Sequence, residues 1–114
     1  MQLPGASYVQ PVKSAAAEGS HVLKASSGYL AWLTTTIGAT SGWLMLFDAA
    51  AAPVDGAVTP AYWFPVNSNG TNGALALSFD PWLPFGTGIV AVFSSTGPFN
   101  KTVSNTAGFI GGVQ

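Results

Sequence analysis

The stretch Gly42–Pro60 constrains the fold of this chain more than any other, because it opens with a strand that is apolar on both faces. If Trp43–Asp48 is extended, one face of the strand carries Trp43, Met45 and Phe47, and the other carries Leu44 and Leu46. A strand with water on one side should alternate apolar and polar residues. This segment does not alternate, so we expect both of its faces to be covered.

Turn residues separate this strand from six other short segments of strand-like composition. Pro53 and the pair Asp55-Gly56 predict a turn with positive φ at Gly56, and the repeated Asn-Gly pairs within Asn67–Gly73 predict another. The expected strands are His21–Ser26, Tyr29–Thr36, Trp43–Asp48, Ala61–Val66, Ala74–Phe79, Ile89–Ser94 and Lys101–Ile110, the last with an interruption near Ala107-Gly108. The chain shows no helical periodicity, so these segments predict an all-β fold. The expected fold is an antiparallel β-sandwich, Ig-like or jelly-roll-like, of about seven short strands.

Two of these strands carry finer predictions. Pro65 cannot donate a ladder hydrogen bond, so the strand around it should lie at a sheet edge or stop there. The segment Ala74–Phe79 alternates cleanly and should point its leucines and Phe79 inward. The stretch Asp80–Gly88, rich in Pro, Gly and aromatic residues, is expected to be a loop.

Residues 1–19 carry Pro and Ala residues but no sustained periodicity, so the sandwich domain is expected to span residues 20–114. The segment then has two interpretations. It is either a tail, or an arm that docks on a neighbouring subunit through Leu3, Tyr8 and Val9.

Charge is scarce in this chain and argues against several classes of function. Only 6% of the residues are charged, against roughly 25% in ordinary soluble domains, while 48% are hydrophobic. Either Ser, Thr and Asn supply the surface polarity, or other protein chains cover much of the surface. Three Lys and no Arg do not provide the basic footprint of a nucleic-acid binder. The uncharged run Ala25–Phe47 is broken by Thr and Gly residues, so we expect strands there and no membrane span.

The sequence offers little chemistry, and neither a metal nor a cofactor is expected. Cysteine is absent and His21 is the only histidine, so a metal site or a nucleophile–histidine pair lacks visible partners. Asp48 and Asp55 bracket one loop and could form an acid/base pair, although such residues more often bind the amides of their own turn. The Trp residues could line a sugar groove, but core or interface use is the favoured interpretation.

Five segments together resemble a known group of proteins. They are Val22–Leu30, Leu46–Ala49, Ala52–Pro60, Gly86–Val90 and Val92–Thr102. The pattern, above all APVDGAVTP and STGPFNKT, resembles small β-sandwich structural proteins of tailed bacteriophages and prophages, of the capsid decoration, cement or head-spike type. The likeness extends roughly from Val22 to Ile110 and implies no catalytic residue.

This resemblance implies a non-enzymatic protein of the virion, assembled in the host cytoplasm. We expect a capsid decoration or cement protein that packs on the major capsid protein or on other virion subunits as a homo-oligomer, with a trimer favoured. The candidate interface residues are Leu3, Tyr8, Val9, Trp43, Leu44, Leu46, Trp63, Trp82 and Phe85. Two alternatives stay open: a carbohydrate- or receptor-binding module of a head fibre or tail, and a hydrolase that uses Asp48 and Asp55.

Overall fold

A computed structural model of the chain describes residues 9–114. In this part the chain forms only strands, turns and irregular segments, and all strand pairs are antiparallel. The strands are β1 (Gln10–Lys13), β2 (Ser20–Lys24), β3 (Gly28–Ile37), β4 (Gly42–Phe47), β5 (Gly56–Ala57), β6 (Tyr62–Val66), β7 (Gly73–Phe85), β8 (Ile89–Ser94), β9 (Asn100–Lys101) and β10 (Gly108–Val113). The expected all-β, antiparallel and sandwich-like arrangement is confirmed.

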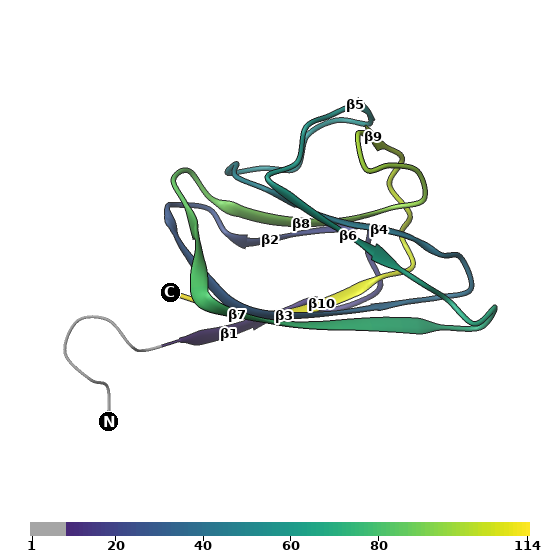
Figure 1. Ribbon diagram of the computed structural model, residues 1–114, viewed down its shortest axis with the longest axis horizontal. Helices are drawn as coiled ribbons and strands as arrows, with labels where there is room; N and C mark the ends of the chain where they lie inside the picture. The colour runs from purple at the N-terminus through teal and green to yellow at the C-terminus, as the bar shows by residue number, and fades with distance from the viewer. Residues whose placement is uncertain (1–8) are drawn as a thin grey trace.

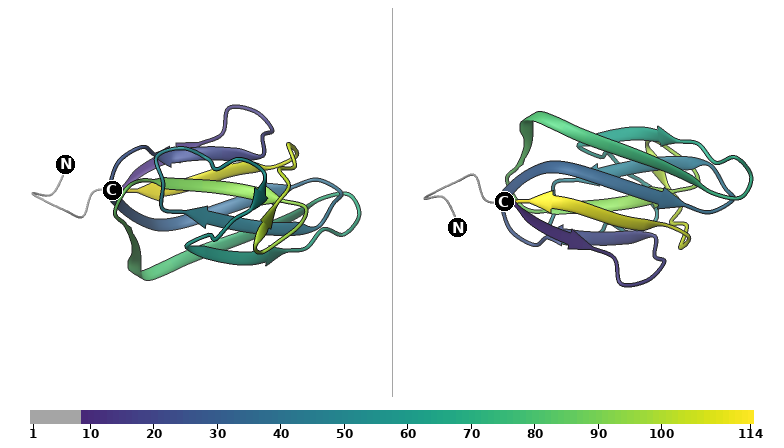
Figure 2. Two further views of the ribbon diagram at one scale, coloured as in Figure 1. Left: turned by 90° about the horizontal axis from the view of Figure 1, so that it is seen from above. Right: turned by 90° about the horizontal axis from the view of Figure 1, so that it is seen from below.

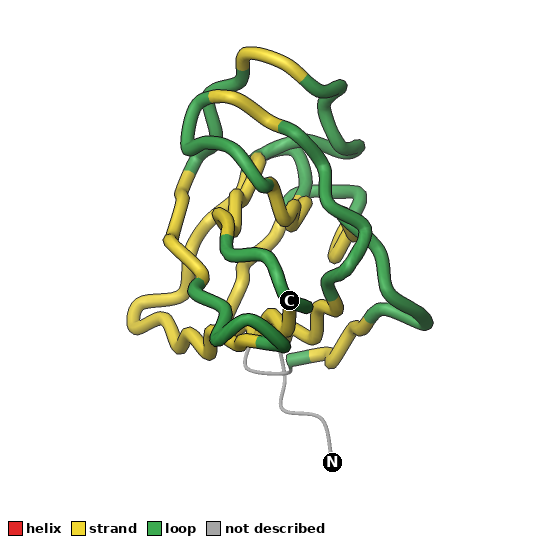
Figure 3. The backbone as a smooth tube through the Cα atoms, turned by 90° about the vertical axis from the view of Figure 1, so that its right-hand side faces the viewer, coloured by secondary structure: helices red, strands yellow, loops and turns green. Residues whose placement is uncertain are grey.

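Two four-stranded sheets face each other, and a short ribbon lies outside one of them (Figure 1). The first sheet has the order β1-β10-β3-β7 and the second has the order β2-β8-β4-β6. The ribbon is the pair β5-β9, which lies above the second sheet (Figure 3). The hydrophobic core lies between the two sheets, where Leu33 and Phe109 of the first meet Leu44 and Phe93 of the second.

The organising strand β4 is buried on both faces, as its composition predicts. Leu44 and Leu46 have no exposed surface and belong to the core between the sheets. Met45 and Phe47 point the other way and form a second apolar cluster with Val90 and Val92 of β8. The chain's own segments beside the β5–β9 ribbon, with Ala49 and Val58, cover this second cluster (Figure 1).

The N-terminal boundary expected at residue 20 is corrected by the structure. Gln10–Lys13 forms β1, an edge strand that pairs with β10, and Glu18 forms an isolated bridge with Ala107. Residues 10–19 therefore belong to the sandwich and do not form a free arm. The strand escaped detection because Pro11 argues against a strand in general, whereas an edge strand tolerates it. Leu3 and Tyr8 of the expected arm lie outside the described residues.

The expected loop at Asp80–Gly88 is also wrong for most of its length. Strand β7 continues through this stretch to Phe85, and its pairing with β3 shifts at an irregularity between Leu30 and Trp32. Because β7 is an edge strand, proline within it removes no bond to a further strand. The other fine predictions are confirmed: β6 with Pro65 is an edge strand, and Leu75, Leu77 and Phe79 pack against the core.

The expected last strand, Lys101–Ile110, divides into two. Asn100–Lys101 pairs with β5, and β10 begins only at Gly108 and joins the first sheet between β1 and β3. The apolar residues of the segment thus serve two different layers. Strand propensity alone does not reveal such a change of layer, because it is decided by packing.

We predict that alanine at two glycines changes stability in opposite directions. Gly56 has φ of +123°, so Gly56→Ala should cost about 1–2 kcal/mol through backbone strain alone, since a methyl group there would meet nothing within 4 Å. Gly38 has an ordinary φ, and a methyl group there would make only ordinary van der Waals contact with Thr106 at 3.5 Å, so Gly38→Ala should be neutral or stabilise by about 0.5 kcal/mol. Urea denaturation measures both. A Gly56→Ala protein as stable as the parent would contradict the strained turn.

We also predict that Thr35→Val stabilises the fold. Thr35 is fully buried in β3, and its Oγ1 has no hydrogen-bond partner within the described residues. Replacing an unsatisfied hydroxyl by a methyl group should raise the free energy of unfolding by about 1–2 kcal/mol. Thr36→Val, at the exposed neighbouring position, is the control and should change it by less than about 0.5 kcal/mol. A Thr35→Val protein less stable than the parent would show that the hydroxyl is satisfied.

Candidate interaction surfaces

The outer face of the second sheet is mostly closed by a lid, which we define as residues 49–60 and 95–103 with the β5–β9 ribbon at its centre. Ala49 and Val58 of the lid pack with Trp43 against the cluster of Met45, Phe47, Val90 and Val92. Figure 3 shows the lid as a third layer above the sheet. The apolar outer face of β4 is therefore buried by the chain itself.

An ion pair between Asp55 and Lys101 ties the two halves of the lid together. The Nζ of Lys101 lies 2.6 Å from Oδ1 of Asp55, and the amide of Val103 donates to Oδ2 at 3.3 Å. Lys101 is only 5% exposed, so its ammonium group depends on this carboxylate for compensation. The hydrogen bond from Lys101 holds the pKa of Asp55 below its ordinary value.

Asp48 has a similar structural role at the other end of the sheet. Its carboxylate accepts hydrogen bonds from the amides of Thr87 at 2.7 Å, Gly86 at 3.0 Å and Gly88 at 3.3 Å. These donors, with Thr87 the strongest, lower the pKa of Asp48. The carboxylate thus fastens the end of β4 to the connection between β7 and β8.

The two aspartates considered as an acid/base pair bind different parts of the chain. Asp48 binds residues 86–88, and Asp55 binds Lys101 and Val103. His21 contacts Glu18, with 2.8 Å between Nδ1 and Oε2. Within residues 9–114 no group of three or more His, Asp or Glu gathers as a metal site would require.

Several residues expected at an interface lie in the core. Leu44 and Leu46 are fully buried, and Phe85 is 3% exposed and packs edge-on against Tyr62 at a centroid distance of 5.9 Å. Trp43 is half-buried against the cluster under the lid. These four side chains are used by the fold itself, and the three that are buried in the core are not available to a partner.

The remaining expected anchors lie at or near the surface. Trp63 is 42% exposed on β6 and stacks edge-to-face with Phe99 of the lid at a centroid distance of 4.9 Å; Phe99 itself is 51% exposed. We call this pair the aromatic ledge. Trp82 is half-buried and lines a shallow hollow with Tyr29. Val9 is half-buried beside Gly112, and Leu3 and Tyr8 are outside the described residues.

A second surface, which the sequence analysis missed, is the outer face of the first sheet; we call it the flat face (Figure 2, right). Cross-strand partners place three pairs side by side on it: Thr36 with Ala74, Thr34 with Ala76, and Trp32 with Ser78. In the same rows, β10 contributes Gly108, Ile110 and Gly112, and β1 contributes Lys13 and Pro11. In the sequence, Ala74–Phe79 and Tyr29–Thr36 each have uncharged residues at their outward positions. Only the pairing of the strands shows that these positions form one continuous surface.

Comparisons of the chain with protein-family models, with curated protein sequences and with solved structures give no match. In the part of the chain that the structure describes, no helix is long and apolar enough to cross a membrane.

We predict that the fold loses stability in acid as the two structural aspartates are protonated. Their pKa values are lowered in the folded state, so their contribution is complete above the ordinary value of 3.8 and is lost as the pH falls through the folded values. The melting temperature should therefore decline from about pH 5 downward. Asp48→Asn should melt lower at neutral pH and decline less on acidification, because it lacks the titrating carboxylate. Parallel curves for the parent and Asp48→Asn would contradict this role.

Proposed function

We propose that this chain is a non-enzymatic structural protein of a tailed-phage virion, a jelly-roll domain that decorates the head and packs on the major capsid protein. The observation that carries the proposal is the strand order. Without β5 and β9, eight strands form two four-stranded sheets, and the first and last strands are neighbours. Jelly rolls consist of eight strands in two sheets and are common in viral capsid proteins.

The same order argues against the Ig-like alternative. In Ig domains the first two strands share one sheet, and the sandwich has four strands facing three. Here β1 and β2 lie in different sheets, and successive strands mostly cross from one sheet to the other. The phage resemblance of Val22–Ile110 implies a small β-sandwich, and a jelly roll is one form of it.

The exposed aromatic ledge supports a binding role and is the surface we assign to the capsid. Trp63 and Phe99 present two large side chains at the border between β6 and the lid, and Trp is the residue most enriched in binding hot spots. Attachment needs no chemistry, because apolar area removed from water contributes about 25 cal/mol per Å². Assembly as a trimer would multiply a modest contact through simultaneous binding.

We predict that the ledge determines capsid attachment. Trp63→Ala and Phe99→Ala should each weaken binding to heads of the parent phage about ten-fold or more, because both side chains would be buried on contact. Val54→Ala is the control, since Val54 is a lid residue that is 85% exposed and does not belong to the ledge. Co-sedimentation of purified protein with undecorated heads measures the effect.

Two other outcomes would argue against capsid attachment through the ledge. Heads that fail to retain the parent protein would contradict the decoration role. If the parent instead binds glycans on an array and loses them on Trp63→Ala, the ledge belongs to a carbohydrate-binding module, because jelly rolls also occur among lectins.

A further inference from the structure

We propose that the flat face is the contact between copies of this chain, with the β1 edge of one copy against the β7 edge of the next. The proposal rests on the homo-oligomeric part of the proposed function and does not depend on the capsid. It concerns the sheet without a lid, on the opposite side of the sandwich from the aromatic ledge (Figures 1 and 2).

The central part of the flat face consists of apolar, small and hydroxyl-bearing residues and carries no charge. Its rows run from Gly108 through Thr36 to Ala74, from Ile110 through Thr34 to Ala76, and from Gly112 through Trp32 to Ser78. No charged side chain interrupts these rows. Antiparallel sheets that face water normally carry polar and charged residues on that side, and interface cores are depleted of charge.

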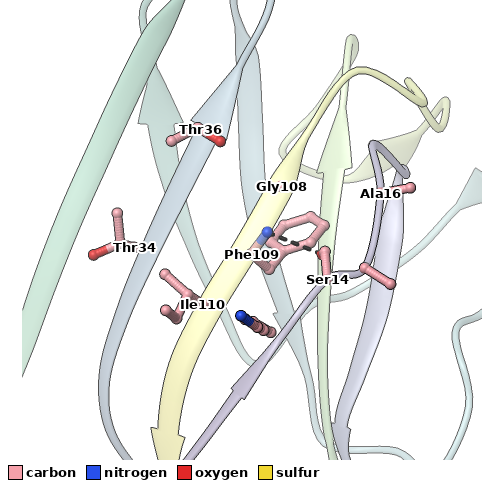
Figure 4. A pocket seen from close by; sticks show the side chains of 9 residues that line it. Ser14, Ala16, Thr34, Thr36, Gly108, Phe109 and Ile110 are labelled. Atoms are coloured by element: carbon pink, nitrogen blue, oxygen red, sulfur yellow. Dashed lines mark hydrogen bonds between the residues drawn. The ribbon is translucent and has the colours of Figure 1, made fainter.

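Two glycines of β10, Gly112 and Gly108, shape the relief of this face. The ideal Cβ position of Gly112 lies 2.2 Å from the indole nitrogen of Trp32, so a side chain there would collide with Trp32, which lies across β10. Gly108 leaves a hollow of about 280 Å³ between Thr34 and Thr36 on one side and Ser14–Ala16 on the other (Figure 4). Ile110, beside this hollow, is 39% exposed. A raised aliphatic side chain next to an apolar hollow is a feature that a second sheet can complement.

The charges at the borders of the flat face identify a second copy as the occupant. Lys13 lies on β1 at one edge of the sheet, and Asp80 lies on β7 at the other edge, between Ser78 and the point at Leu83 where β7 resumes its pairing with β3; both residues are exposed. Neither side chain has an ion-pair partner within the described residues, whereas Lys101 and Glu18 both do. The same chain therefore supplies one positive edge and one negative edge, which attract each other when copies meet edge to opposite edge.

This arrangement also selects among the possible orientations. Superposing β1 on β1 would bring like charges together, which is unfavourable across an interface. Placing β1 of one copy near β7 of the next pairs Lys13 with Asp80. When two flat faces meet in this way, β1 of each copy lies near β7 of the other, so the contact is two-fold symmetric and closes at two copies.

The test uses purified full-length protein alone, so that its result is independent of capsid binding. Sedimentation equilibrium should show an oligomer of the parent at micromolar concentration. Ile110→Lys should weaken association about 100-fold, because a charge would be buried in an apolar contact. Val22→Lys is a matched control: Val22 is 40% exposed against 39% for Ile110, but lies on the other sheet, and its substitution should leave association unchanged.

The edges are tested by charge reversal and by cross-linking. Lys13→Glu and Asp80→Lys, both at exposed positions, should each weaken association about ten-fold, and the double variant should restore it. A carbodiimide should join Lys13 to Asp80 between copies, as shown by mass spectrometry of mixed isotope-labelled and unlabelled protein. These exposed variants decide the question even if Ile110→Lys does not fold.

Three results would overturn the proposal. They are a parent protein that is monomeric at about 100 µM, an oligomer that Val22→Lys disrupts as strongly as Ile110→Lys, and a double charge reversal no better than either single one. If the protein oligomerises through the flat face but does not bind heads, the inference holds and the proposed capsid role fails.

Discussion

Burial of β4 on both faces is the interaction on which the rest of the structure depends. Leu44 and Leu46 enter the core between the sheets, while Met45 and Phe47 enter the cluster under the lid. Burying each such side chain contributes about 1.5–3 kcal/mol, so this one short strand supplies a large share of the apolar stabilisation of a small domain. It can do so only if the chain provides a layer on each side, and the second sandwich sheet provides only one of them.

The lid is the second layer, and it explains where two of the few charged residues are used. A ribbon as short as β5–β9 makes few ladder hydrogen bonds, so it needs other attachments. Lys101 and Asp55 supply one, and Asp48 fastens the adjacent end of β4 to residues 86–88. In a chain with 6% charged residues, these groups thus hold loops in place.

The lid also changes which face is available to a partner. The apolar outer side of β4 predicts a covering layer on the second sheet, and the chain supplies most of that layer itself. The exposed apolar surface lies elsewhere, on the aromatic ledge at the border of the lid and on the flat face of the first sheet. One molecule therefore presents two separate surfaces, as the proposed contacts with its own copies and with the capsid require.

The sequence by itself determined the class of the fold and most of its strands, because strand alternation and turn chemistry are local properties. The positive φ at Gly56, the edge position of Pro65 and the double burial of β4 all follow from residues close together in the chain. Tertiary structure alone decided the layer that each strand joins, since that depends on partners far away in the sequence. It made Gln10–Lys13 a strand by pairing it with β10 and separated Asp48 from Asp55 by giving each its own partners. It also assembled the flat face from strands β1, β10, β3 and β7, and no local sequence pattern shows that these strands are neighbours.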